Sequence, residues 1–171
     1  ASSLVGSEMC IRDRFKWAAD LEDRNKLWQA RWDVYYSVKA LVHNGRVYST
    51  DVCVPISRIT ECVKFAEVEV NKIGLRAPMV GHLGDGNFHV LFPYDPNDKE
   101  IYKKIREFSN KLIDKTLELK GTITGEHGVG LHKKSYLLKE HPDNIPLMKT
   151  IKRSIDPNTV SYTHLRAHET A

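Results

Sequence analysis

The chain has 171 residues, of which 41% are hydrophobic and 28% are charged, and its formal net charge is +4. This length and balance predict one globular domain with a single core. Basic and acidic residues alternate, which predicts no nucleic-acid partner, and no apolar run reaches the roughly 18 residues of a membrane helix.

The two ends of the chain differ from the rest. Residues 1–14 and 160–171 resemble translated sequencing-adapter read-through, and neither end has amphipathic periodicity or capping residues. The alternative is a natural disordered tail at each end. We therefore expect one folded domain over residues 15–159, in which Cys53 and Cys62 are reduced core residues and no targeting segment is visible.

The first half of this domain predicts a helix, a strand and a second helix. Apolar residues at helical spacing predict a helix over residues 21–42, which Asn44-Gly45 ends. The β-rich run 47–54 predicts a strand. Ser57 is then the expected N-cap of a helix that continues to Gly74.

The second half continues with two strands and a helix. Residues 78–83 and 88–92 predict short strands, and a long helix opens at residues 95–97 and ends at Gly121. A short strand at 122–124 and two short helices, at 133–139 and 145–155, follow. The order β-α-β-β-α-β predicts an α+β fold: a ferredoxin-like split βαβ sandwich with an extra N-terminal helix and short C-terminal helices. Because that fold hosts many functions, function must be argued from sites.

The first chemically informative motif is residues 81–89, GHLGDGNFH. Asp85-Gly86 favours a two-residue type I′ hairpin turn, because both central positions need a positive φ. That turn would place His82 directly opposite His89 on one face of the hairpin. Two imidazoles so placed could share a cation of the zinc or manganese type. The alternative is two incidental histidines on a solvent-facing surface.

The second motif is residues 125–130, GEHGVG, which sets an acid beside a base between glycines. The glycines let the backbone approach a ligand closely. Adjacent side chains of an extended segment point to opposite faces, so Glu126 could reach the same cation while His127 serves as a general base. The alternatives are a Gly-rich surface turn and a phosphate loop, although neither motif has the Lys-Ser/Thr pair of a P-loop.

Together the two motifs resemble the C-terminal domain of FAD-linked oxidases of the vanillyl-alcohol-oxidase superfamily, and within it the branch of cytochrome-linked D-lactate dehydrogenases. Residues 49–58, 27–31 and 151–158 also fit that family, so the resemblance covers residues 27–158. It implies a flavin-dependent oxidation of a D-2-hydroxy acid to its 2-oxo acid. D-lactate is the first expectation, and D-2-hydroxyglutarate and glycolate are the alternatives.

The resemblance also implies roles for single residues. His82, His89 and Glu126 would bind a divalent metal, zinc or manganese, which would acidify the substrate hydroxyl. His127 would take the hydroxyl proton while FAD accepts the hydride. Asn87 would lie near the flavin, so Asn87 and Glu126 are the expected cofactor-binding residues.

Substrate and partners follow from the same resemblance. Arg31 would pair with the carboxylate of a small 2-hydroxy acid; the alternative for an arginine on an amphipathic helix is a solvated charge. The electron acceptor is expected to be cytochrome c or another carrier, and the location mitochondrial in a eukaryote and cytoplasmic otherwise. No flavin-cradling sequence is present, so we expect a fragment that is inactive by itself.

Two other function classes stay open from the residues alone. A metal-dependent hydrolase could activate water with the same three ligands and would need no flavin. A non-catalytic ferredoxin-like module could bind a ligand without chemistry. Metal content with esterase and phosphatase assays tests the first, and substitution of His127 tests the second.

Overall fold

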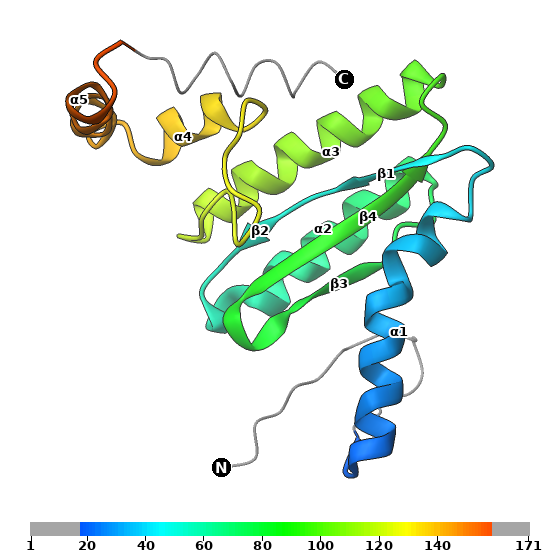
Figure 1. Ribbon diagram of the computed structural model, residues 1–171. Coiled ribbons are helices and arrows are strands. Elements are labelled where there is room, and N and C mark those ends of the chain that lie inside the picture. The colour runs from blue at the N-terminus through cyan, green and yellow to red at the C-terminus, as the bar shows by residue number, and fades with distance from the viewer. Residues whose placement is uncertain (1–17, 159–171) are drawn as a thin grey trace. The chain divides into compact units, whose positions relative to one another are not determined.

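The computed structural model describes residues 18–158, and the chain divides into two compact units, Ala1–Val129 and Gly130–Ala171. The first unit contains three long helices and four strands in its described part (Figure 1). In chain order its helices and strands are α1 (Leu21–Lys39), β1 (Arg46–Ser49), β2 (Val52–Cys53), α2 (Ile59–Ile73), β3 (Met79–His82), β4 (Asn87–Tyr94) and α3 (Lys99–Glu118).

The central strand of the sheet is β4. β1 and β2 pair with one side of it in a single antiparallel register, and the ladder is interrupted between them at Thr50 and Asp51. β3 pairs antiparallel with the other side of β4. The predicted strand at 122–124 is reduced to one antiparallel bridge between Cys53 and Thr122. Across the sheet, the segment at 122 is followed by β1 and β2 in one position, then by β4 and then by β3. This is the strand order of a split βαβ sandwich. The predicted α+β class is confirmed.

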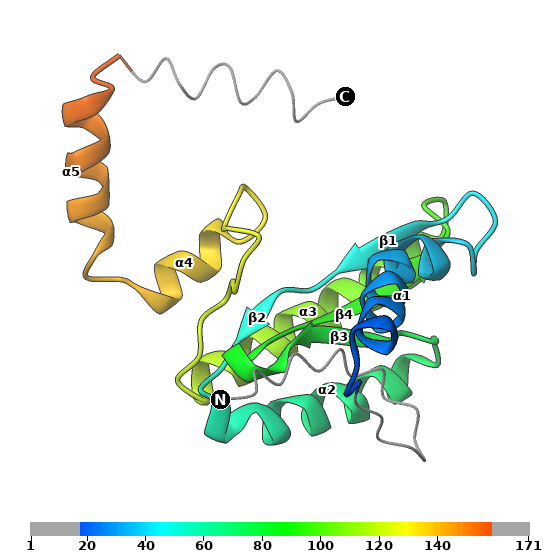
Figure 2. The ribbon, with the colours of Figure 1, turned by 60° about the horizontal axis from the view of Figure 1, so that its bottom comes forward.

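Two helices cover one face of the sheet and α1 crosses the other (Figures 1 and 2). Successive residues of β4 point to opposite faces, and Phe92 meets Phe108 of α3 edge to face, with ring centroids 4.9 Å apart. Asn87 and His89 therefore face away from α2 and α3. The core between the sheet and these helices comprises Val52, Cys62, Ala66, Val70, Phe88, Val90, Phe92, Ile105, Phe108, Leu112 and Ile113.

The helix ends differ in detail from the predictions. Ser57 is not an N-cap, because a 3-10 turn over Ile56–Arg58 comes first and α2 begins without a side-chain cap. Gly74 ends α2 with a φ of 77°, as predicted. Lys120, not Gly121, takes the left-handed backbone (φ 62°) after α3. Gly121 is required because a Cβ there would collide with the carbonyl of Cys53.

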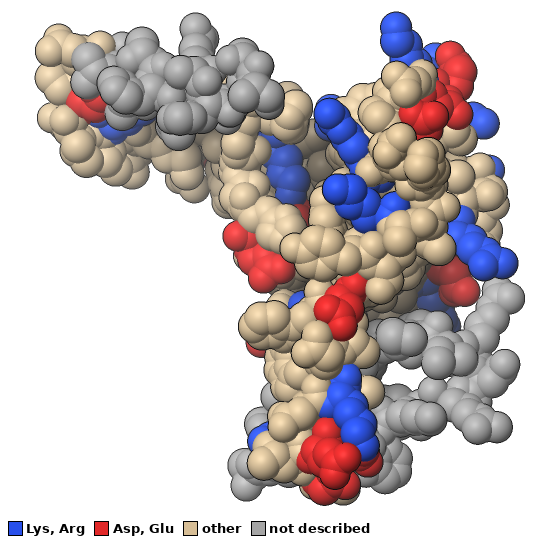
Figure 3. Space-filling model, turned by 45° about the vertical axis from the view of Figure 1, so that its right-hand side comes forward, with Lys and Arg blue, Asp and Glu red and all other residues tan. Residues whose placement is uncertain are grey.

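The extra N-terminal helix is present but buries little. Of its residues, only Val38 is fully buried, while Trp32, Tyr35 and Tyr36 are exposed. Near its N-terminal end Lys26 pairs with Glu22 and Asp23 of the first turn, and Figure 3 shows the two signs of charge side by side at that end. The helix thus reaches the sheet mainly through its second half.

The second unit contains α4 (Lys134–Glu140) and α5 (Ile145–Ile155), both close to their predicted ranges. The helices of residues 18–158 include none that is long and apolar enough to cross a membrane. Cys62 is buried and Cys53 half-buried, and both are free thiols. The adapter-like ends, 1–14 and 160–171, lie outside the described residues.

Candidate metal and proton-transfer site

The β3–β4 hairpin positions two of the expected ligands, but not as predicted. Leu83–Asp85 form a 3-10 turn, and Gly86 closes it with a φ of 79°. His82 therefore pairs with Asn87, and His89 pairs with Val80. The predicted direct pairing of His82 with His89 is wrong, because the connection is longer than a two-residue turn. The observed register differs from the predicted one by two residues. Because this is an even number, both histidines still lie on one face of the hairpin.

A carboxylate from the glycine loop 124–130 joins the two histidines. Glu126 Oε1 lies 2.8 Å from Nε2 of His89, and Glu126 Oε2 lies 3.9 Å from Nε2 of His82. The His89 side chain is 6% exposed, whereas those of His82 and Glu126 are 42% and 43% exposed. The structure thus brings the three expected ligands together, with His89 as the buried member.

His89 faces Glu126 with a nitrogen that lacks a directed hydrogen bond. Its Nδ1 lies 2.9 Å from the Thr50 carbonyl, which can only accept, so Nδ1 carries a proton. The buried Nε2 makes no hydrogen bond within the described residues, although a carboxylate oxygen is 2.8 Å away. Two acceptors so close need a cation between them or a second proton on the ring.

The surroundings of His89 suit a divalent metal. Nδ1 of the buried His89 ring donates to a backbone carbonyl, and Nε2 faces a carboxylate. Proteins orient histidine ligands of metals in this way. His89, Glu126 and His127 also offer ligand atoms that all lie within 4.8 Å of one another. The residues present therefore fit a metal of the zinc or manganese type.

His127 lies against the same group. Its ring stacks on that of His89 with centroids 4.9 Å apart and 15° between the planes. Its Nε2 is 3.5 Å from Glu126 Oε1, and its side chain is 52% exposed. A half-exposed imidazole beside the ligand group can either bind the cation or exchange a proton with a substrate held there.

Arg31 reaches this site from α1. Its Nη2 donates to Nε2 of His82 over 3.0 Å, since a guanidinium has no acceptor. The structure thus places the expected substrate-binding arginine next to an expected metal ligand, although the two are 51 residues apart in the chain.

Asn87 is buried beneath the glycine loop. A Cβ on Gly125 would collide with its carboxamide, so this glycine is required by close approach. The Oδ1 of Asn87 is buried and has no hydrogen-bond partner in the described part of the chain. An unpartnered acceptor here could take a ring N–H, which fits the expected position near a flavin.

Asp51 is the site residue that the sequence reasoning missed. Its side chain is 2% exposed and accepts hydrogen bonds from the loop that carries Glu126 and His127. The available signal was an acid inside a β-rich run, next to a threonine, where a buried strand would be apolar.

Sequence comparisons identify related proteins. The family described as FAD linked oxidases, C-terminal domain, matches residues 5–160. The chain is 42% identical over 147 residues to a probable mitochondrial D-lactate dehydrogenase of Danio rerio, covering 85% of this chain and 30% of that protein. It is 33% identical over 152 residues to the mitochondrial D-lactate dehydrogenase (cytochrome) of Kluyveromyces lactis, covering 86% and 26%. It is 30% identical over 135 residues to the mitochondrial D-2-hydroxyglutarate dehydrogenase of Danio rerio, covering 78% and 24%.

Proposed function

We propose that this chain carries the metal and proton-transfer site of a D-2-hydroxy-acid dehydrogenase. The chain belongs to the family of FAD-linked oxidases, as their C-terminal domain. The chain spans less than a third of the length of the relatives it matches. The proposal therefore concerns the whole protein to which this domain contributes. Its substrate would be D-lactate and its product pyruvate, which the names of two of the three relatives support.

The observation that carries the proposal is the contact between His89 and Glu126. Nε2 of His89 is buried and lies 2.8 Å from a carboxylate oxygen, and the Thr50 carbonyl fixes the ring by accepting from Nδ1. This geometry supports binding of a cation between the two groups. A divalent metal at this point would bind the substrate's hydroxyl and carboxylate oxygens and lower the pKa of the hydroxyl. His82 would complete the ligand set after releasing Arg31, because the Nε2 that lies 3.9 Å from Glu126 accepts a hydrogen bond from Arg31 in this structure.

Two further side chains would handle the substrate. Arg31 would bind the substrate carboxylate, because its planar guanidinium forms paired hydrogen bonds to a planar anion. His127 would take the hydroxyl proton on Nε2, which lies 3.5 Å from Glu126 Oε1 on a half-exposed side chain. Bound FAD would accept the hydrogen on C2 as hydride, so that the alcohol leaves as a ketone. Asn87 would lie at the flavin side of the site.

The electron acceptor and location are part of the proposal. The name of the Kluyveromyces lactis relative refers to a cytochrome, which supports cytochrome c or another electron carrier as acceptor. The names of all three relatives refer to mitochondria, which supports a mitochondrial location if the source is a eukaryote.

The test uses the full-length protein that contains this domain. D-lactate, L-lactate, D-2-hydroxyglutarate and glycolate are each mixed with it without oxygen, and bleaching of the flavin absorbance is followed. We expect D-lactate to bleach the flavin fastest, a chelator to slow the reaction, and Zn²⁺ or Mn²⁺ to restore it.

Three results would overturn parts of this proposal. Absence of bleaching by any 2-hydroxy acid would refute the dehydrogenase. Faster bleaching by D-2-hydroxyglutarate would move the substrate to that acid. Metal-dependent hydrolysis of an ester or phosphate ester, without a flavin requirement, would instead favour a hydrolase.

A further inference from the structure

We propose that Asp51 is a positioning residue of this site, and that its buried carboxylate holds the loop bearing Glu126 and His127 in the conformation needed to bind metal and substrate. The role in metal binding rests on the proposed function. The positioning itself rests on geometry within the first unit.

Four donors of one loop segment converge on Asp51. Its Oδ2 accepts from the backbone N–H groups of Gly125, Glu126 and His127 at 3.0, 3.2 and 2.9 Å. The same oxygen accepts from the hydroxyl of Thr124 at 2.7 Å. A carboxylate offers acceptors only, and hydrogen bonds to a charged acceptor are stronger than neutral ones. Asp51 therefore fixes three consecutive peptide units, two of which carry the chemically active side chains.

Ile123 is fully buried, but none of residues 124–128 is, so polar contacts and not apolar packing hold this segment. The chain after α3 makes a single β-bridge at Thr122, and the side chains of Glu126 and His127 are 43% and 52% exposed. Apolar packing thus contributes little to their positions. The Asp51 carboxylate, at 2% exposure, is by contrast buried.

The break in the sheet between β1 and β2 produces this geometry. Thr50 donates its N–H to the Val90 carbonyl, but its own side-chain hydroxyl accepts from the Val90 N–H. Because the hydroxyl takes the place of the carbonyl in the ladder, the Thr50 carbonyl can accept from Nδ1 of His89. The next residue, Asp51, leaves the ladder with β4 and turns its carboxylate to the loop. One two-residue interruption thus orients His89 through Thr50, and Glu126 and His127 through Asp51.

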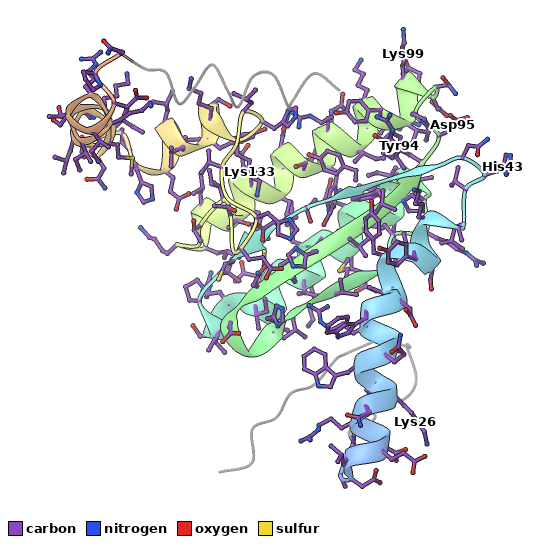
Figure 4. The ribbon with its side chains drawn as sticks, viewed as in Figure 1. Lys26, His43, Tyr94, Asp95, Lys99 and Lys133 are labelled. Carbon is purple, nitrogen blue, oxygen red and sulfur yellow. The ribbon has the colours of Figure 1, made fainter. Side chains whose placement is uncertain are left out.

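The test compares Asp51→Asn with Asp95→Asn in the full-length protein. Asp95 is a suitable control because its carboxylate also accepts a backbone N–H, from Asn97 at 2.9 Å, but at the β4–α3 turn (Figure 4). Hydrogen–deuterium exchange is measured at the amides of residues 125–127 and along β4. Binding of Mn²⁺ is measured by its electron paramagnetic resonance, with His89→Ala in parallel.

We expect Asp51→Asn to speed exchange at the amides of residues 125–127 by about 10- to 100-fold, because an amide side chain supplies one neutral acceptor and a competing donor. Protection along β4 should persist, and the affinity for Mn²⁺ should fall by about 10- to 100-fold, as for other groups that orient ligands. Asp95→Asn should change neither quantity at this site. Wild-type exchange at residues 125–127 in Asp51→Asn would overturn the positioning, and unchanged Mn²⁺ affinity would overturn its role in metal binding.

A second variant covers the case in which Asp51→Asn does not fold. Thr124→Val keeps the side-chain shape and removes one of the four donors, so it should speed loop exchange by several fold, whereas Thr124→Ser should behave as wild type. Equal exchange in the two Thr124 variants would count against the proposal. A wild-type protein that binds no Mn²⁺, or binds it as well with His89→Ala, would refute the proposed metal site, and loop exchange would still decide the role of Asp51.

Discussion

Replacing Glu126 by Gln is the most direct test of the proposed metal site. The substitution keeps the shape of the side chain but removes its charge and one of its two acceptor oxygens. Those oxygens lie 2.8 Å from Nε2 of His89 and 3.9 Å from Nε2 of His82. Among the three expected ligands Glu126 is the only carboxylate, so the variant would leave the cation with no charged ligand from this set.

The expected loss of metal affinity follows from the removal of this one charged ligand. Groups that only orient a ligand typically change metal affinity by about 10- to 100-fold when they are altered. Loss of a direct and charged ligand should cost at least the upper end of that range, about 100-fold or about 2.7 kcal/mol. The rate of D-lactate oxidation should fall with it and recover in part at high Mn²⁺ concentration.

The assay is a titration of the metal-free full-length protein with Mn²⁺ and Zn²⁺ by calorimetry. Glu100→Gln is the matched control, because Glu100 is an exposed carboxylate in the first turn of α3. The control should bind both ions as wild type does. Equal affinities in Glu126→Gln and Glu100→Gln would refute the assignment of Glu126 as a ligand.

Three further substitutions test the base, the core and an ion-pair network. His127→Ala should leave metal and flavin bound but lower turnover by about 10²- to 10⁴-fold; near-normal turnover at neutral pH would exclude His127 as the base. Leu112→Ala, at a position that is 0% exposed in α3, should lower the free energy of unfolding in urea by about 2–5 kcal/mol, and a negligible loss would contradict the described core. Hydrogen bonds from Lys111 and Lys72 lower the pKa of Glu69 below its ordinary 4.5, so its contribution to stability is present above that pH and is lost as the pH falls through the lowered value. Glu69→Gln should therefore be less stable than wild type at neutral pH, and a difference that persists in strong acid would contradict this.

Much of the fold could be predicted because its signals are local. Apolar spacing located α2 and α3 to within a few residues, since each of these helices buries one stripe of its own sequence. The alternating order of strands and helices then restricted the sheet to few topologies. Local signals were weaker where a contact with a distant part of the chain decides which residue is needed. Gly121 was interpreted as a helix stop, but it is required by the carbonyl of Cys53 on another strand.

The candidate site shows the same division. The two glycine motifs indicated His82, His89, Glu126 and His127 from their residue types and order, and the structure brings these side chains together. The hairpin register was wrong, because Gly86 ends a 3-10 turn instead of completing a type I′ turn. The shared face was nevertheless retained, since side chains alternate with a period of two residues.

The amino-acid sequence by itself therefore determined the helices, the strand order and the types of ligand available. Tertiary structure alone decided how those ligands are held. Asp51 lies 74 residues before Gly125 in the chain, and Thr50 lies 39 residues before His89. Hydrogen bonds over such separations depend on where the folded sheet breaks its ladder, and no local propensity encodes that position. A buried carboxylate is tolerated at this break between β1 and β2 only because the folded loop supplies the donors that replace its water.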